Sequence, residues 1–573
     1  DGLLFIGTSA FADCVSLRSI YIPDSVVNIY EGAFANCASL ETVHMSTNLE
    51  NLYQESFSGC SMLETMHIPP GVTKIDDSTF RDCSSLVEVL LPSAINHIGN
   101  YAFSGCNLLP NIQIPGELGF LGASAFSDCS SLTEVDIPGG TTILRESVFS
   151  NCHSLKKVTI GAGILEIRDR GFYNCESLEG IMIPLGMKVI GVEAFMNCTA
   201  LVEVEFLSEE LTIGQSAFAH CSGLKEIALP EGVKEIGDLA FSECVNLVSA
   251  ELPASSARRL GAGLFEGCIS LATVNLPEGM FRVSERMFSG CASLTEVDLP
   301  ESITEIRQSA FLGSGLTQVS FPWDTTVIEE SAFAYCLGLT EITVPYSVTI
   351  LGRAVFEQCQ NLIRVEIPGD FYSMGDSLFL NCSQLEEAVL GDLTPFLPDR
   401  MFFQCENLKK IYFTGNAPMP GMEVFAGIHA DATVYFSSDA SGFSTPEWQG
   451  LPSEALALVG GRLRWALRNG LNFQIDWDAT DTPTGIPLLF YYAFDLRPNE
   501  PVSFQGEIQG NECAYWIFAG RRDLTYSGET SSDLVTWSSE GVALSKPDLD
   551  GYRKATINLD DGRCFVRFRF VEN

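Results

Sequence analysis

Hydrophobic and polar residues alternate in short stretches that return at a fixed interval along most of the chain. In residues 16–23, SLRSIYIP, Ile20 and Ile22 alternate with Ser19 and Tyr21, which is the two-residue period of a half-buried β-strand. The proline that follows lacks a backbone N–H and predicts the end of that strand. A second apolar stretch of the form V-x-x-I predicts another extended segment. The next phrase, A-F-x-x-C, has the length of a single helical turn on the return path.

This unit repeats every 23 residues. Cysteines hold the same place in the unit from Cys14 to Cys405, with one residue inserted before Cys268 and Ser314 standing where one cysteine is expected. One residue is deleted just after Ser314, and a phenylalanine stands three residues before every one of these positions. One unit cannot bury its own apolar side chains, whereas stacked copies can. The pattern therefore predicts a solenoid with a parallel sheet along one face.

The unit, seen in GAFANCASLETV and EAFMNCTALVEV, resembles the BspA-type leucine-rich repeat of bacterial and protozoan surface proteins. The resemblance covers residues 1 to about 437. It implies a leucine-rich repeat solenoid of about 18 repeats plus a degenerate last repeat, a secreted or cell-surface location, and an adhesin-like function. The chain begins in the middle of a repeat, so we expect it to be a processed or trimmed piece of a longer protein.

The pattern changes after the repeats. Residues 438–452 are expected to form a cap or linker, because the exposed end of a solenoid needs a cap. Residues 453–573 contain short alternating runs, such as CAYWIFAG and CFVRFRFV, between Gly, Asp and Ser turns, which predicts a small all-β sandwich domain. A short helix is expected in LRWALRNGLNF (463–473). The phrases GIPLLFYYAFDLRPN and FVRFRF resemble a C-terminal module of large secreted bacterial proteins.

The column of cysteines admits three interpretations. A zinc site needs about four converging ligands, whereas parallel rungs point their cysteines in the same direction. Disulfides between neighbouring rungs lie within reach, but the column has an odd number of members and Ser314 interrupts it without the loss of a partner. The third interpretation, small buried thiols that pack the wall, accommodates a serine most easily. We therefore expect the thiols to be packing residues.

The net charge of −40 argues against a nucleic acid or an anionic membrane as partner. Residues 453–573 carry 12 Lys+Arg and 17 Asp+Glu, a net charge of −5, which leaves −35 for residues 1–452. No uncharged apolar run is long enough to predict membrane insertion. The sequence contains no nucleophile, phosphate-loop or metalloprotease motif, so we expect neither enzymatic activity nor a cofactor.

The outward positions of the predicted strands are the candidate ligand-binding residues, because the core constrains them least. Near the N-terminus they include one aromatic and two histidine side chains, and further along they are mostly acidic. These candidates are Tyr21, His44, His67, Glu134, Asp136, Glu203, Glu205, Glu226, Glu251, Glu296, Asp298 and Glu341, and the same outward positions include Glu366 and Glu387, with Arg364 among the few bases.

Several interpretations of this face remain open. The acids suit a cationic protein surface or a glycan held through calcium, or they serve only solubility. Tyr21, His44 and His67 suggest a stacking ladder or sugar-facing platform, and the two histidines suggest a weak metal site. Two alternatives assign the strand face no ligand: the protein is a structural spacer, or it is a carbohydrate-binding accessory that acts through its C-terminal domain.

Two further features lie in that C-terminal domain. The first is a weak calcium candidate formed by Asp476, Asp478 and Asp481, which lacks the D-x-D-x-D-G spacing of a calcium loop. The second is the pair Cys513 and Cys564, both on predicted strands, which could form a disulfide in an oxidising compartment.

Overall fold

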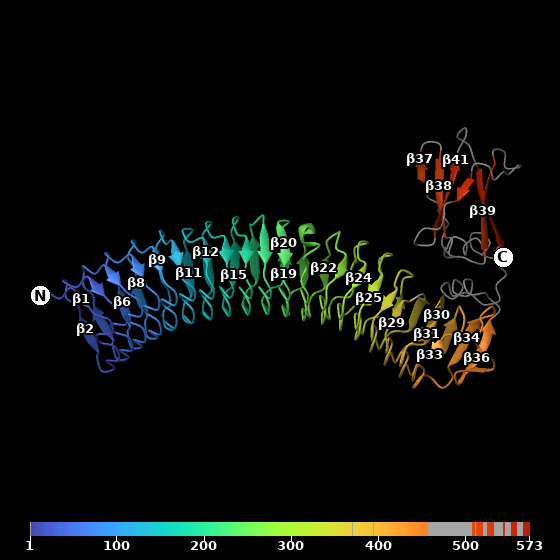
Figure 1. Cartoon of the computed structure of the whole chain (residues 1–573), viewed down its shortest axis with the longest axis horizontal. Coiled ribbons are helices and arrows are strands. Elements are labelled where there is room, and N and C mark those ends of the chain that lie inside the picture. Colours follow the sequence, from blue (N-terminus) through green and yellow to red (C-terminus); the bar gives the residue numbers. More distant parts are fainter. Residues whose placement is uncertain are drawn as a thin grey trace. The chain divides into compact units, whose positions relative to one another are not determined.

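The computed structural model of the chain describes residues 2–369, 371–393 and 395–456, together with six strands between Glu507 and Glu572 (Figure 1). The chain divides into two compact units. Unit 1 comprises residues 1–322 and 329–338, and unit 2 comprises residues 323–328 and 339–573. Within each unit the repeats stack as successive rungs, with short strands side by side (Figure 1).

Most rungs begin with a strand from the segment that follows the repeated leucine. In unit 1 these first strands are β2 (Ser19–Tyr21), β4 (Thr42–His44), β6 (Thr65–His67), β8 (Glu88–Leu90), β11 (Glu134–Ile137), β13 (Lys157–Ile160), β15 (Gly180–Ile183), β17 (Glu203–Phe206), β19 (Glu226–Ala228), β21 (Ser249–Glu251) and β22 (Thr273–Asn275). They pair in parallel in sheets of two to four strands. The predicted parallel sheet along one face is therefore confirmed.

The V-x-x-I segments form a second series of shorter parallel strands. In unit 1 these second strands are β1 (Phe5–Ile6), β3 (Asn28–Ile29), β5 (Asn51–Leu52), β7 (Lys74–Ile75), β9 (His97–Ile98), β10 (Phe120–Leu121), β12 (Ile143–Leu144), β14 (Glu166–Ile167), β16 (Val189–Ile190), β18 (Leu211–Ile213), β20 (Val233–Ile236), β23 (Arg282–Val283) and β24 (Glu305–Ile306). Partners in the regular rungs lie 23 residues apart, as for Glu166 and Val189. The sequence period is thus the register of the solenoid.

The return path is a pair of tight turns and not the helical turn that the sequence predicts. In each rung the residues two before and two after the phenylalanine have positive φ, as at Ser78 (53°) and Asp82 (59°) around Phe80. A left-handed residue ends a right-handed helix, so the three residues between the two left-handed positions cannot extend into one. The described residues contain a single 3₁₀-helix, η1 (Ala254–Ser256), and no α-helix.

The core of the solenoid is a stack of phenylalanine rings lined by thiols. In unit 1 successive rings, from Phe11 to Phe333, stack with centroids 5.1 to 6.0 Å apart. The seventeen repeat cysteines are all free, and all but Cys14 are buried. Burying each Phe and Cys against the next rung supplies the apolar contact that a single repeat lacks.

Unit 2 continues the same plan with longer strands. They are β25 (Val327–Ile328), β26 (Glu341–Thr343), β27 (Ile350–Leu351), β28 (Arg364–Gly369), β29 (Ser373–Met374), β30 (Glu387–Leu393), β31 (Phe396–Leu397), β32 (Lys410–Phe413), β33 (Met419–Pro420), β34 (Thr433–Ser437), β35 (Glu447–Trp448) and β36 (Leu451–Leu456). β36 adds in parallel to β34, and β35 folds back on β36 as an antiparallel pair. The buried Trp448 ring contacts Phe413, Phe425 and Phe443, which covers the last rings of the stack.

The C-terminal strands are antiparallel. They are β37 (Glu507–Gln509), β38 (Glu512–Phe518), β39 (Leu524–Ser531), β40 (Val542–Leu544), β41 (Tyr552–Asn558) and β42 (Phe565–Glu572). One sheet has the order β37-β38-β41-β40, and β39 pairs with β42. These strands agree with the β-strands that the sequence predicts here, whereas the all-β sandwich domain stays a prediction. The helix expected at 463–473 lies outside the described residues.

Candidate binding face

The outward side chains of the first strands in unit 1 form the candidate site, which we call the strand face. Each first strand directs its middle side chain inward and the flanking ones outward, as in β19, where Ile227 is buried between exposed Glu226 and Ala228. Every acidic candidate in unit 1 is exposed: Glu134, Asp136, Glu203, Glu205, Glu226, Glu251, Glu296 and Asp298. The predicted outward orientation of these residues is confirmed. Glu296 and Asp298, however, lie in a rung without a regular first strand.

The register spaces most of these acids apart. Glu134 lies opposite Lys157 and Asp136 opposite Thr159. Glu203 and Glu205 lie opposite Gly180 and Met182. In the next sheet, Glu226 lies opposite Ser249 and Glu251 opposite Asn275. Neutral or basic neighbours thus separate like charges on paired strands, which avoids the repulsion of charges directly opposite one another.

The sequence places Glu203 and Glu226 on successive rungs, where they should repel. In the structure, β17 ends one sheet and β19 begins the next, so these two carboxylates are not in a registered pair. Among the described residues, no group of three or more His, Cys, Asp or Glu side chains is arranged to hold a metal ion. The strand face is therefore a dispersed array of carboxylates.

Ion pairs in unit 1 lie away from the strand face. They join residues of the second strands, such as Glu166 and Arg168 at 2.7 Å, or residues of the turns, such as Arg170 and Glu193 at 2.6 Å. None of the described ion pairs of unit 1 involves an acid of the strand face. The negative charge of this face is thus not compensated within the part of unit 1 that the structure describes.

The N-terminal candidates come together only in part. Tyr21 and His44 are registered partners whose ring centroids lie 6.3 Å apart at 45°. His67 instead lies opposite Leu90 in a separate sheet. Tilted rings do not form the continuous stacking ladder that the sequence suggested, although all three candidate side chains are exposed.

Unit 2 treats the same strand positions differently. Glu341 is exposed and lies opposite Arg364. The Nε of Arg364 lies 3.0 Å from the Glu387 carboxylate, and its Nη1 lies 3.8 Å from that of Glu366. Glu366 is 1% exposed, so its predicted place on an exposed acidic face is wrong. The reason is local. The Arg364 guanidinium lies beside the Glu366 carboxylate, and Val389, the registered partner of Glu366 on the next strand, is also buried.

The thiols make a contact that the sequence did not reveal. Each buried Cys Sγ in unit 1 donates a hydrogen bond of 3.0 to 3.3 Å to the carbonyl of the Phe in the preceding rung, as from Cys60 to Phe34. Burial raises the pKa of the Cys60 thiol to about 12. The thiols are thus protonated donors, in keeping with the predicted packing role.

Ser314 fits into this row of thiols. Its side chain is buried, and its Oγ lies 3.3 Å from the Sγ of Cys336. Burial raises the pKa of Cys336 to about 12, although the hydrogen bond from Ser314 partly lowers it. A hydroxyl of similar size can therefore replace one thiol without opening the core.

The C-terminal candidates are only partly described. Cys513 lies on β38, as predicted, whereas Cys564 lies outside the described residues. The calcium candidates Asp476, Asp478 and Asp481 also lie outside them. The disulfide and the calcium site therefore stay predictions. Within the described part of the chain, no helix has the length and apolar character needed to cross a membrane.

Several solved structures resemble this chain. A leucine-rich repeat protein from Bacteroides ovatus is 27% identical, covering 68% of this chain and 82% of its own, with a TM-score of 0.44. A leucine-rich cell surface protein from Faecalibacterium prausnitzii is 25% identical, covering 65% and 83%, with a TM-score of 0.35. The pneumococcal vaccine antigen PcpA is 18% identical, covering 69% and 89%, also with a TM-score of 0.35.

No curated protein matches this chain. The model of the BspA type leucine-rich repeat region matches in overlapping stretches, 4–133, 120–230, 188–317 and 304–430. Together these stretches span about three quarters of the chain and include both strand series of the solenoid. The chain belongs to the BspA-type leucine-rich repeat family.

Proposed function

We propose that this chain is a secreted or cell-surface bacterial protein that binds a macromolecular partner through the strand face of unit 1, in the manner of an adhesin. The observation that carries the proposal is the exposed negative charge of this face, which no described ion pair of unit 1 neutralises. Lys157 is the one base registered against these acids, so the face keeps a net negative charge that attracts cationic surfaces. The family to which residues 4–430 belong supports the location.

The partner that suits this face best is a protein with a cationic surface. The carboxylates are dispersed along several rungs, so binding rests on many weak contacts and on electrostatic steering. A protein surface with spaced Lys and Arg side chains matches such an array better than a small ligand, which needs converging groups. A polysaccharide held through calcium is the second candidate, and it needs carboxylates in closer groups than the register provides.

The test is a binding screen against immobilised extracellular proteins and polysaccharides, with the full chain and a triple variant. Glu203→Gln, Glu205→Gln and Glu226→Gln together should weaken binding about tenfold and flatten its salt dependence. The melting temperature should be unchanged, because these side chains are exposed.

The matched control removes three exposed acids elsewhere in unit 1, through Glu50→Gln, Glu117→Gln and Glu301→Gln. Equal weakening by both triple variants would show that only net charge matters and would reject the strand face. Retention of full binding by the first variant would also reject it.

A structural spacer is the alternative, and the unbroken phenylalanine stack of unit 1 favours it. A spacer retrieves no partner in the screen, and only deletion of whole rungs changes its behaviour. An accessory that acts through the C-terminal domain loses binding when residues 457–573 are removed, and it is indifferent to the triple variant.

A further inference from the structure

The repeat that leads to Cys268 in unit 1 contains one inserted residue. The extra residue falls in the segment Pro253–Arg259, which forms η1, the single 3₁₀-helix among the described residues. The rung recovers its register immediately afterwards, because the N–H of Gly261 donates to the carbonyl of Ile236 at 2.9 Å. In a regular repeat every rung offers the same surface, so a surface unlike the others arises where the repeat is interrupted.

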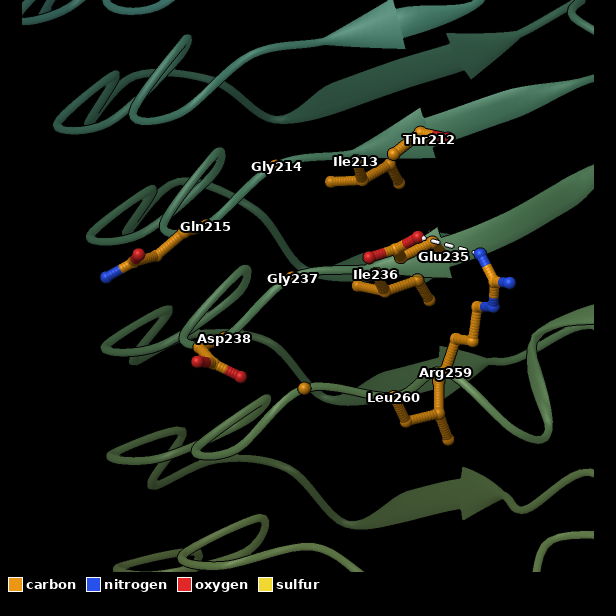
Figure 2. A pocket seen from close by; sticks show the side chains of 11 residues that line it. Thr212, Ile213, Gly214, Gln215, Glu235, Ile236, Gly237, Asp238, Arg259 and Leu260 are labelled. Atoms are coloured by element: carbon orange, nitrogen blue, oxygen red, sulfur yellow. Dashed lines mark hydrogen bonds and ion pairs between the residues drawn. The ribbon is translucent and has the colours of Figure 1, made fainter.

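Two hollows flank this interruption, and Arg259 lines both of them. One, of about 530 Å³, lies over β18, β20 and the rung of Arg259 (Figure 2). The other, of about 510 Å³, lies against η1. Neither hollow is lined by a residue of a first strand, so both are separate from the strand face.

The hollow against η1 is lined by cations. Lys234, Arg258 and Arg259 line it, with Glu278 as its one carboxylate. Arg258 is exposed and forms none of the ion pairs of the described residues. In a chain with a net charge of −40, three bases around one hollow form an unusual local surface. Guanidinium and ammonium groups gathered in this way suit a carboxylate or sulfate.

Two of the three bases have partners that a ligand can displace. Lys234 lies 3.1 Å from Glu210, and Arg259 lies 3.1 Å from Glu235, as Figure 2 shows for the second pair. Their side chains are 60% and 66% exposed. Exposed pairs of this kind contribute at most about 1 kcal/mol, so they do not hold the bases against a better anion.

In the neighbouring hollow the acids Glu235 and Asp238 outnumber the single base, Arg259. Figure 2 shows Gln215 and Asp238 at one end, and Glu235 reaching toward Arg259 at the other, with Gly214 and Gly237 between them. Its apolar members, such as Ile236, are buried in the core and so do not line it with exposed apolar side chains. Amides and carboxylates accept hydrogen bonds from hydroxyl groups, which are the groups that a sugar presents.

We propose that the two hollows bind an acidic oligosaccharide. A carboxylate or sulfate of one sugar lies against Arg258 and Lys234, and the hydroxyls of the adjoining sugar bond to Gln215, Asp238 and Glu235. Arg259, common to both hollows, spans the junction. This site lies on another surface and does not depend on the function proposed for the strand face.

The experiment compares tetragalacturonate with its fully methyl-esterified, uncharged form by calorimetric titration of the full chain. A sulfated disaccharide and inorganic phosphate serve as the other anions. The acid form should bind at least about tenfold more tightly than the ester, and phosphate should bind more weakly than either acidic sugar. If the ester binds as well as the acid, or if phosphate binds as well as the sugars, the proposal is overturned.

Arg258→Gln should weaken binding of tetragalacturonate about tenfold. The control is Arg282→Gln on β23, which removes the same charge from an exposed position outside both hollows. Equal loss of affinity in both variants would overturn the proposal, because the net charge of the protein alone would then explain the binding. Melting temperatures of both variants, each altered at an exposed position, show that the fold is retained.

Discussion

Unit 1 and unit 2 share one repeat but use its outward strand positions in opposite ways. In unit 1, Glu203 and Glu226 stand exposed, and no described ion pair compensates them. In unit 2, Arg364 occupies a corresponding position. It forms ion pairs with Glu366 and Glu387, and the three side chains make a largely buried cluster. The same strand geometry therefore carries unpaired carboxylates in unit 1 and carboxylates paired with an arginine in unit 2. The repeat alone does not determine which of these occurs.

The two units have the same kind of buried cysteine but different numbers of them. Unit 1 contains fourteen of the seventeen repeat cysteines, and unit 2 contains Cys359, Cys382 and Cys405. Burial raises the thiol pKa in both units, to about 12 for Cys60 and Cys405. Ionisation of the thiols should therefore affect the stability of unit 1 more than that of unit 2.

The largest expected effect is loss of stability at alkaline pH. A folded-state pKa above the ordinary value of 9.0 means that the folded chain keeps thiol protons that the unfolded chain releases. Stability is therefore complete below pH 9 and falls as the pH rises from 9 toward 12. Each buried thiol lowers the stability as the pH rises through this range, and the losses from many rungs act in the same direction.

Hydrogen exchange resolved along the chain at pH 8 and pH 10.5, corrected for the intrinsic exchange rate, measures this effect. Unit 1 should lose protection before the solenoid rungs of unit 2. Equal protection at both pH values would contradict the account of the thiols as buried protonated donors.

The second effect concerns the charge cluster of unit 2. Arg364→Ala leaves the buried Glu366 and the half-buried Glu387 without their guanidinium, which should destabilise unit 2 by about 3 kcal/mol. Lys157→Ala, at the exposed position opposite Glu134 in unit 1, is the control and should cost no more than about 0.5 kcal/mol. Chemical denaturation of the two variants provides the comparison, and similar losses would erase the distinction drawn between the units.

The smallest effect tests the thiol wall itself. Cys198→Ser reproduces the substitution that the chain already contains at Ser314, and it should destabilise unit 1 by about 1 kcal/mol or less. Cys198→Ala should cost more, because the carbonyl of Phe172 then loses one of its two donors and keeps only the N–H of Cys175. Thermal unfolding of both variants measures the difference. A serine variant less stable than the alanine variant would argue against the hydrogen bond as the reason for the column.

Sequence periodicity predicted the fold well because stacking in register is dictated by identical repeats. A 23-residue spacing leaves one regular register, and the outward residues of β11 through β22 follow from it. The turn was predicted less well. The signal was present, since Asn, Asp and Gly, which tolerate positive φ, often precede the cysteine, as at Asn36 and Gly59.

The candidate site was predictable only as a set of exposed positions. The break between β17 and β19 and the burial of Glu366 depend on side chains in neighbouring rungs, which a pattern of single repeats does not contain. The hollows beside η1 follow from one inserted residue. The position of the inserted residue could be read from the sequence, but which basic side chains would lie together around it could not.

The hydrogen bonds of the turns have a mechanical consequence. The N–H of Phe34 donates to the carbonyl of Ser56, and the N–H of Phe57 donates to that of Thr79, so these bonds join one rung to the next. A force that pulls the ends of unit 1 apart acts along these bonds and opens them one rung at a time. Each rung then releases 23 residues, about 80 Å of slack. Under tension such a molecule would lengthen in small steps, one rung at a time, before the whole of unit 1 is unfolded.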